Sequence, residues 1–247
     1  MLRSLSRLSR LSSLAVEGLV EALWPARCLA CDEPAGFDPR LCDDCALGLA
    51  RLVPRQCRVC ARPLLDTMPE ERCEACSRRR PPFSRLTAFG PYEGARRALV
   101  SRLKFTGLRV AAGPLAQGLV RCELLHRASH PEEWCDAVVP LPLAPSRERQ
   151  RGFNQSRLLA EPVAAALAVP LRPDVLVRRG GGRQLGRSRA ERRRLGVEAF
   201  AAGGGYGARL LLIDDVVTTG ATLRAATRAL LAAGARDVRC LVAARTD

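Results

Sequence analysis

The chain has 247 residues, 47% of them hydrophobic, and a formal net charge of +15. Its length accommodates one sizeable core plus a smaller module, and no apolar run approaches the ~18 residues that a transmembrane helix needs. The charge is concentrated, since residues 147–194 hold 13 arginines and four acidic residues and should attract phosphate groups. Arginine supplies all but one of the 40 basic residues, however, and such a compositional bias is equally compatible with a solvated surface.

The first segment, residues 1–24, is basic and rich in leucine, as targeting peptides are. Glu17 and Glu21 interrupt the stretch that would have to be continuously apolar in such a peptide. We therefore predict an N-terminal amphipathic helix. Without an export signal or a membrane span, a cytoplasmic location is expected.

Residues 25–80 contain eight cysteines in four identical C-x-x-C pairs. Each pair supplies two thiolates for a tetrahedral Zn²⁺, so two pairs complete one site, and two structural Zn²⁺ ions are predicted. Disulfides or redox dithiols are the alternatives, and the lack of an export signal or a thioredoxin-like context disfavours both. Consecutive pairing closes shorter loops than interleaved pairing, although the spacing does not decide between them. The expected ligands are Cys28, Cys31, Cys42, Cys45, Cys57, Cys60, Cys73 and Cys76.

Residues 83–247 show strands alternating with helices. Buried strands are predicted at 137–139, 210–213 and 238–243, and helices at 157–167 and 221–233. This alternation indicates an α/β domain with a mainly parallel sheet and helices on both faces, whose ligands bind at the carboxyl ends of the strands. Cys122, Cys135 and Cys240 are expected in the core, and neither His126 nor His130 has a catalytic partner in view.

The segment LLLIDDVVTTGAT, residues 210–222, places two carboxylates directly after four aliphatic residues. Because buried carboxylates are costly, the strand is expected to end at Ile213 with Asp214 and Asp215 at an open edge. The hydroxyls and backbone N–H groups of Thr218–Thr222 would then surround a phosphate at a helix N-terminus. A phosphate beside groups that bind a vicinal diol indicates a phosphorylated ribose.

This segment resembles the phosphoribosyl-diphosphate signature of type I phosphoribosyltransferases. The wider chain resembles the ComF family, whose members join a double zinc ribbon, here residues 25–80, to a phosphoribosyltransferase-like domain, here 83–247. Besides the cysteine pairs, the resemblance is carried by KFTG at 104–107, VPLP at 139–142 and RGFNQ at 151–155.

The resemblance implies that Asp214 and Asp215 contact the ribose hydroxyls and act in catalysis, with Mg²⁺ bound together with phosphoribosyl diphosphate. It also implies that residues 178–194 close over the site, although Gly181 and Leu195 replace the threonine and asparagine usual in this loop. Read from the residues alone, Lys104 is equally compatible with a solvated helix-end cation, and Asn154 is expected to cap the helix that follows it. The residues it assigns to phosphoribosyl diphosphate are Lys104, Pro140, Leu141, Pro142, Gln184, Asp214, Asp215, Val216, Val217, Thr218, Thr219, Gly220, Ala221 and Thr222.

Two functions compete. The first is a phosphoribosyltransferase, in which no side chain has to act as a nucleophile because the acceptor attacks the sugar. The second is a non-catalytic competence factor that keeps the ribose-phosphate pocket while docking to single-stranded DNA and DNA-uptake proteins, the partners that the ComF resemblance implies. Aromatic residues are only 4% of the chain, which leaves few side chains on which bases could stack.

Overall fold

The computed structural model describes residues 26–35, 41–51, 55–65, 71–179, 199–204 and 207–246. The helix expected within residues 1–24, Gln184 and most of the expected closing loop lie outside the described residues.

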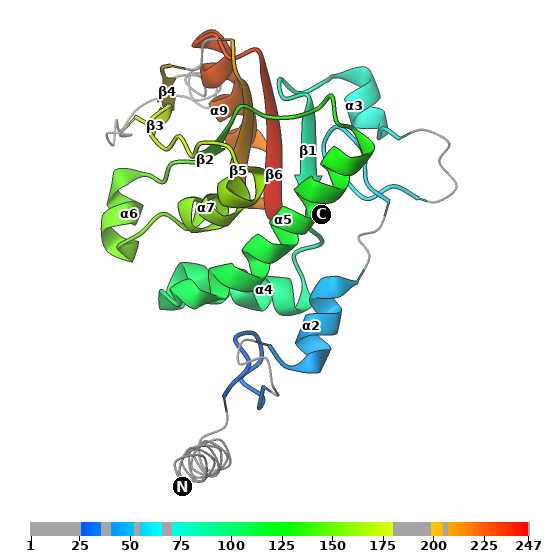
Figure 1. Cartoon of the computed structure of the whole chain (residues 1–247), viewed down its shortest axis with the longest axis vertical. Coiled ribbons are helices and arrows are strands. Elements are labelled where there is room, and N and C mark those ends of the chain that lie inside the picture. Colours follow the sequence, from blue (N-terminus) through cyan, green and yellow to red (C-terminus); the bar gives the residue numbers. More distant parts are fainter. Residues whose placement is uncertain are drawn as a thin grey trace, which may run out of the picture.

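A four-stranded parallel sheet with the order β1-β6-β5-β2 forms the centre of the molecule (Figure 1). This architecture confirms the predicted fold class, and each of the three predicted strands forms. Two further strands, β3 (Leu176–Arg178) and β4 (Phe200–Ala202), make a separate antiparallel pair. The strands of the main sheet are β1 (Arg85–Ala88), β2 (Ala137–Pro140), β5 (Arg209–Val217) and β6 (Asp237–Arg245).

Helices cover both faces of the sheet (Figure 1). Side chains alternate along β5, so that Leu211 and Ile213 pack on the side of α5 and α7, whereas Leu210 and Leu212 pack on the side of α9. These two apolar layers bury both faces of the sheet, which fixes the positions of the residues at the carboxyl ends of its strands. The covering helices are α4 (Gly94–Ser101), α5 (Ala112–Ser129) and α7 (Gln155–Leu167) on one face and α9 (Ala221–Ala232) on the other.

The prediction that the central strand ends at Ile213 is wrong, because β5 continues through both carboxylates to Val217. Asp214 and Asp215 are buried, with 8% and 3% of their surface exposed. Each one finds a partner that the sequence does not place nearby, namely Ser156 for Asp214 and Lys104 for Asp215. The strand β2 stops opposite Ile213, whereas β5 continues past this point. The two buried carboxylates at the end of β5 line a pocket there.

A buried ion cluster joins α5 to two strands. Glu123 lies with its carboxylate oxygens 3.0 Å from Nη2 of Arg85 in β1 and 3.2 Å from Nη1 of Arg239 in β6. All three side chains are buried, so the carboxylate compensates two guanidinium groups that would otherwise be stranded in the core. This cluster fixes the helix against the sheet.

The cysteine-rich region packs on the α/β domain at two places. The first part includes α2 (Asp43–Ala50) and lies against α4. There Cys28 and Leu49 join the core on the face of the sheet that α4, α5 and α7 cover. The second part, with α3 (Glu74–Arg78), lies along β1, where the backbone N–H of Leu86 donates to the carbonyl of Val59. The two parts therefore contact different sides of the same domain.

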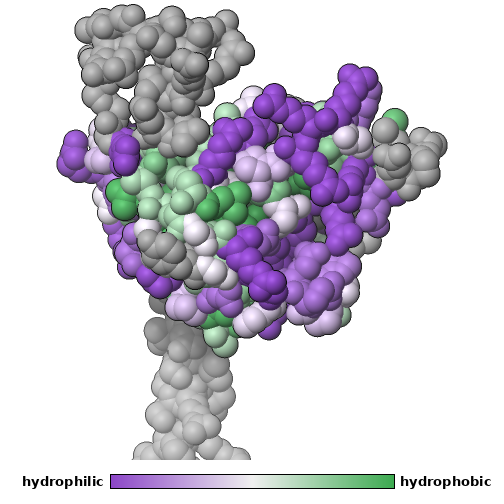
Figure 2. Space-filling model, turned by 90° about the horizontal axis from the view of Figure 1, so that it is seen from above, coloured by the Kyte–Doolittle hydropathy of each residue, from purple (hydrophilic) through white to green (hydrophobic). Residues whose placement is uncertain are grey.

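Hydrophilic side chains cover much of the described surface in the view from above, with apolar residues between them (Figure 2). None of the described helices is long and apolar enough to cross a membrane.

The remaining described elements are a π-helical turn η1 (Arg102–Thr106), a 3₁₀ turn η2 (Arg109–Ala111) and the short helix α6 (Pro145–Arg151).

Candidate functional site: two cysteine clusters and a pocket at the sheet edge

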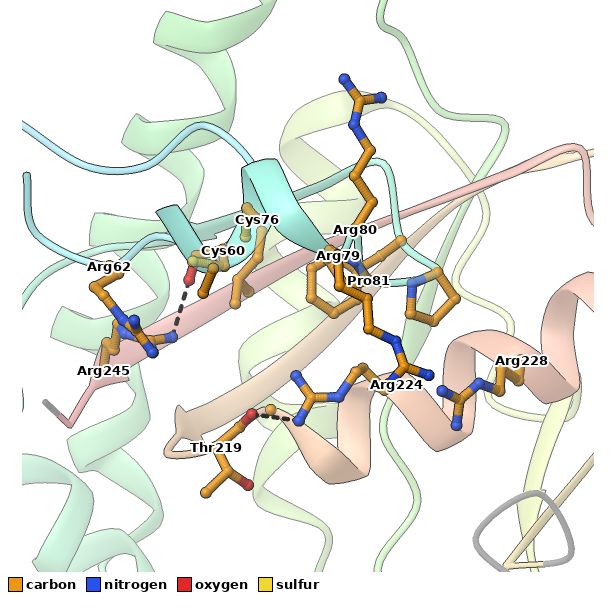
Figure 3. A pocket seen from close by; sticks show the side chains of 15 residues that line it. Cys60, Arg62, Cys76, Arg79, Arg80, Pro81, Thr219, Arg224, Arg228 and Arg245 are labelled. Atoms are coloured by element: carbon orange, nitrogen blue, oxygen red, sulfur yellow. Dashed lines mark hydrogen bonds between the residues drawn. The ribbon is translucent and has the colours of Figure 1, made fainter. Parts of the chain in front are cut away.

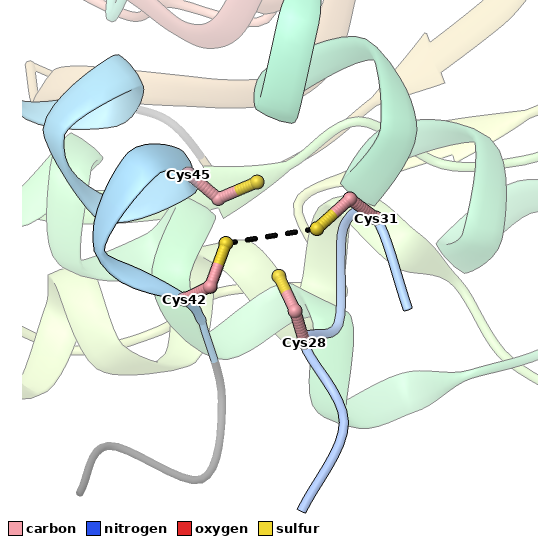
Figure 4. Close-up of side chains that lie close together, drawn as sticks. All are labelled: Cys28, Cys31, Cys42 and Cys45. Atoms are coloured by element: carbon pink, nitrogen blue, oxygen red, sulfur yellow. Dashed lines mark hydrogen bonds between the residues drawn. The ribbon is translucent and has the colours of Figure 1, made fainter. Parts of the chain in front are cut away.

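The eight paired cysteines form two compact clusters, and they pair consecutively along the chain. Within each cluster the four sulfur atoms lie within 4.8 Å of one another. Figure 4 shows the first cluster, whose sulfurs point toward a common centre. This spacing is consistent with two structural Zn²⁺ sites, and it resolves the pairing that the spacing in sequence leaves open. The clusters are Cys28, Cys31, Cys42 and Cys45, and Cys57, Cys60, Cys73 and Cys76.

The thiol acidities also fit a metal. Although burial opposes ionisation, backbone N–H groups hold the pKa of Cys28 at about 6 and that of Cys57 at about 7. Burial and the neighbouring thiols raise the pKa of Cys45 and of Cys76 far above the ordinary value. Thiolates gathered this closely repel one another, and a bound Zn²⁺ would supply two compensating positive charges.

A pocket of about 770 Å³ opens at the carboxyl end of β5. Its lining comes from η1, from the loop after β2, from α6, from the start of α7 and from β5 itself. Such convergence at the end of central strands is typical of ligand sites in parallel α/β sheets. The polar side chains around the pocket are those of Lys104, Thr106, Arg147, Gln150, Arg151, Gln155, Ser156, Arg178, Asp214, Asp215 and Thr222.

Asp215 and Lys104 form an ion pair on the floor of this pocket. Nζ of Lys104 lies 3.0 Å from Oδ1 of Asp215, and the lysine side chain is 22% exposed. Gly107, with φ of 71°, ends the η1 turn that carries the lysine. Oδ2 of Asp215 is buried and has no hydrogen-bond partner. A buried carboxylate oxygen without a donor is costly, and Asp215 lines a pocket into which a ligand could bring a hydroxyl donor.

Asp214 is held differently from its neighbour. Its Oδ1 accepts hydrogen bonds from Oγ of Ser156 at 3.0 Å and from the backbone N–H of Asp215 at 2.9 Å. Burial, and then the adjacent charge of Asp215, raise the pKa of Asp214 to about 7. A carboxyl group with a strongly raised pKa therefore lines this pocket, and such groups are common at functional sites.

The loop 218–222 turns from β5 into α9. Gly220 has φ of 72°, a conformation that favours glycine, and it caps the helix without a side-chain hydrogen bond. No acidic residue lies in the first turn of α9, so its N–H groups and partial positive charge are available to an anion. Thr218, Thr219 and Thr222 are exposed along this loop.

Asn154 connects two parts of the site. Its side-chain oxygen accepts from the backbone N–H of Ser156, which caps α7, and its amide donates to the carbonyl of Leu141 at 3.0 Å. The helix cap expected of Asn154 is thereby confirmed, and the same side chain fixes the loop after β2. Arg151 donates to Gln155 at 2.6 Å beside it.

The structure brings several of the expected ligand-binding residues together. Lys104, Leu141, Pro142, Asp214, Asp215 and Thr222 all line the pocket. The side chain of Val217 instead packs in the core, and Thr219 and Gly220 line a neighbouring pocket.

Sequence reasoning missed Ser156, and it included Arg147 and Arg151 only within the arginine-rich stretch 147–194. Ser156 is 58 positions from Asp214, and only the RGFNQ segment just before it gave a signal. Phe105 also lines the pocket and is 80% exposed, which puts an aromatic ring at its rim.

His126 pairs with an acidic residue outside the pocket. Its Nε2 lies 2.9 Å from Glu133, and burial followed by the charge of Arg85 lowers its pKa to about 4. The histidine is therefore neutral near pH 7 and lies away from the pocket.

Comparison with known proteins identifies both modules. Residues 19–77 match the double zinc ribbon domain, and residues 154–246 match the phosphoribosyl transferase domain. The chain is 32% identical to "DNA utilization protein YhgH" of Salmonella typhimurium, over 90% of this chain and 98% of that protein. It is 30% identical to "Competence protein ComFC" of Streptococcus pneumoniae, over 82% and 86% of the two chains.

Among solved structures, a purine phosphoribosyltransferase from Pyrococcus horikoshii aligns with 51% of this chain and 70% of its own, at 14% identity and a TM-score of 0.32. That likeness is too distant to bear on function. The alignments with these two relatives cover 98% and 86% of their own length and most of this chain. The chain belongs to the ComF/YhgH family, in which a double zinc ribbon precedes a phosphoribosyltransferase domain.

Proposed function

We propose that the pocket at the end of β5 binds phosphoribosyl diphosphate together with Mg²⁺, in a protein that serves the handling of incoming DNA. The observation that carries this proposal is the pair Asp214 and Asp215, which both line the pocket, and Oδ2 of Asp215 has no hydrogen-bond partner within the described residues. The ribose 2′- and 3′-hydroxyls are donors of the kind that this buried oxygen lacks. The link to DNA comes from relatives named for DNA utilization and competence.

The rest of the ligand finds complementary groups nearby. The 5′-phosphate would accept from the N–H groups at the start of α9 and from the hydroxyls of Thr218, Thr219 and Thr222. Arg147 and Arg151 would face the negatively charged diphosphate, beside the loop of Leu141 and Pro142. Each chemical part of the ligand therefore has a matching part of the pocket.

The same residues support transfer chemistry. As the bond to pyrophosphate breaks, positive charge develops on the sugar, and the carboxylates of Asp214 and Asp215 would stabilise it. Lys104 holds the carboxylate of Asp215 in place. Mg²⁺, which the oxygen-rich ligand and the carboxylates suit, would neutralise the leaving pyrophosphate.

Binding without transfer is the second candidate, favoured by relatives whose printed names describe DNA utilization and competence rather than an enzyme. A screen for pyrophosphate release over bases, amines and single-stranded DNA separates the two. Release with one acceptor, abolished in Asp215→Asn, supports the transferase. Tight binding of phosphoribosyl diphosphate with no release for any acceptor supports the binding protein.

A further inference from the structure

A second pocket lies between the zinc-ribbon region and α9, and it is lined by arginines without acids. Its volume is about 370 Å³, and no aspartate or glutamate occurs among its 15 lining residues. The arginines come from four parts of the chain: the second ribbon, the linker before β1, the helix α9 and the end of β6. They are Arg62, Arg79, Arg80, Arg224, Arg228 and Arg245. We call this pocket the arginine groove.

No acid lines the groove, and none of its six arginines has a carboxylate partner within the described residues. Within the described residues, Arg58, Arg157 and Arg172 all make ion pairs with acids, whereas no arginine of the groove does. Only two of the six make side-chain hydrogen bonds, and both donate to backbone carbonyls. A solvated surface with biased composition would intersperse acids, so this segregation of charge indicates an anionic ligand.

Hydrogen bonds join the walls of the groove to one another. Nη1 of Arg245 donates to the carbonyl of Cys60 at 2.9 Å, which ties the ribbon to β6. Nη2 of Arg224 donates to the carbonyl of Thr219 at 2.7 Å, which ties the groove to the loop 218–222. Phe83 and Leu86 form its buried apolar floor. The guanidinium groups of Arg224 and Arg245 are therefore held in place.

The arrangement of the charges points to a chain of phosphates. Arg224 and Arg228 are one helical turn apart, about 6 Å along the axis of α9, and so reach successive groups of an extended ligand. In Figure 3, Arg79 extends toward these two side chains, while Arg80 points away from them and Arg62 lies near Arg245 at the other end. A single small anion could not meet both ends of this row.

We propose that the arginine groove binds the phosphate backbone of single-stranded nucleic acid, with the zinc ribbon as one wall. The one aromatic residue lining the groove, Phe83, is 3% exposed, so no base can stack there and sequence is not read. The groove includes Thr219 and Gly220 of the loop 218–222. Thr222 of the same loop lines the pocket at the end of β5, which we call the sugar-phosphate pocket after the ligand proposed for it. This inference deepens the DNA-linked part of the proposed function and is independent of phosphoribosyl-diphosphate binding.

The test uses the full-length, zinc-loaded protein and fluorescence anisotropy with a labelled oligothymidylate of about 20 nucleotides. The variant Arg62→Gln/Arg79→Gln/Arg228→Gln removes three groove charges whose side chains make no hydrogen bond or ion pair within the described residues. Affinity should fall at least tenfold at low salt. Because each phosphate contact on a single strand contributes about 0.7 to the salt slope, the slope should shrink by about 2.

The matched control is Arg97→Gln/Arg121→Gln/Arg236→Gln, which removes the same charge from exposed positions outside the groove. This variant should bind within about twofold of the wild type, with nearly the same slope. Equal losses in the two variants would overturn the groove and leave only a general charge effect. An unchanged groove variant would overturn it too, with the DNA-linked function then resting on other residues. If the wild type does not bind the oligonucleotide, both the groove and the DNA-linked part of the proposed function are contradicted.

A calorimetric titration with phosphoribosyl diphosphate and Mg²⁺ separates this inference from the sugar-phosphate proposal. The groove variant should bind that ligand as the wild type does. If the wild type binds the oligonucleotide through the groove but does not bind phosphoribosyl diphosphate, the groove stands and the sugar-phosphate site falls.

Discussion

Two neighbouring pockets share the loop after β5, and they use charge in opposite ways. The sugar-phosphate pocket buries two carboxylates and offsets one of them with Lys104. The arginine groove displays its cations on the surface and gives them no carboxylate within the described residues. Buried, partnered charge favours a small ligand of defined shape, whereas exposed, unpartnered charge favours an extended anion whose affinity depends on salt.

The largest expected effect concerns the pH dependence that the buried pocket creates. The pKa of Asp214 is about 7 when folded and 3.8 in its ordinary state, so the folded protein binds the extra proton between these values. The contribution of Asp214 to the free energy of unfolding is therefore fully present below the ordinary pKa of 3.8 and is lost as the pH rises to about 7. The difference corresponds to at most about 4 kcal/mol.

Asp214→Asn removes this titration, so its stability relative to the wild type should rise between pH 5.5 and pH 8. Urea unfolding of both proteins in the same zinc-buffered solutions measures the difference, and zinc release affects both alike. Parallel curves across this range would contradict the raised pKa. The arginine groove should be unaffected, with equal oligonucleotide binding in both proteins.

The next largest effect is expected from removing the zinc site of the second ribbon, which borders the arginine groove. Cys76→Ser should lower the zinc content from two per chain to one and lose the wall that the second ribbon supplies. Loss of two charge-assisted contacts, at about 1.5 kcal/mol each, predicts a roughly 100-fold weaker oligonucleotide complex.

Cys31→Ser is the matched control, because its cluster lies on the α4 side and contributes nothing to the groove. It should also lose one zinc but keep oligonucleotide binding. Elemental analysis and anisotropy measure the two properties. Identical binding losses in both variants would mean that zinc acts through global folding and not through the groove.

Lys104 gives a smaller effect inside the pocket. Lys104→Met leaves Asp215 buried beside Asp214 without a counter-charge, which should cost about 2 kcal/mol of stability. Asp215→Asn should cost less, because the freed lysine is 22% exposed and can reach water. Thermal melts of the two variants compare these costs, and an unchanged melting temperature in Lys104→Met would show that the ion pair is not stabilising.

The smallest effect lies in the shared loop. Thr219→Val keeps the shape of the side chain but removes its hydroxyl, which accepts from the N–H of Ala221. Loss of one hydrogen bond to a phosphate predicts roughly a fivefold to tenfold weaker complex with phosphoribosyl diphosphate, since such bonds contribute about 1 kcal/mol. Unaltered binding in this variant would place the phosphate elsewhere.

Local patterns predicted the parts of this molecule that depend on neighbours in sequence. The C-x-x-C pairs, the parallel α/β sheet and the cap at Asn154 were all predicted and are confirmed. Consecutive cysteine pairing, preferred on loop length, is also confirmed. Each of these features is determined within about twenty residues of chain or by a strand and helix period.

The errors arose where distant segments meet. The strand was predicted to end at Ile213 because two buried carboxylates are costly, and the prediction failed since Ser156 and Lys104 reach them from other elements. The arginine groove was missed for the same reason, because its walls come from residues 60–86 and 219–245. The charge excess in the sequence pointed instead to 147–194, whose Arg147 and Arg151 line the sugar-phosphate pocket.

Calorimetric titration of phosphoribosyl diphosphate with Mg²⁺ into the wild type and into Asp214→Asn/Asp215→Asn tests the central claim most directly. The double variant keeps the shape of the pocket but removes both carboxylates that would accept from the ribose hydroxyls. We expect saturable binding in the wild type and at least a tenfold loss in the double variant, with its oligonucleotide binding unchanged. Equal affinity in the two proteins, or no binding to the wild type, would contradict a ribose-phosphate site at the end of β5.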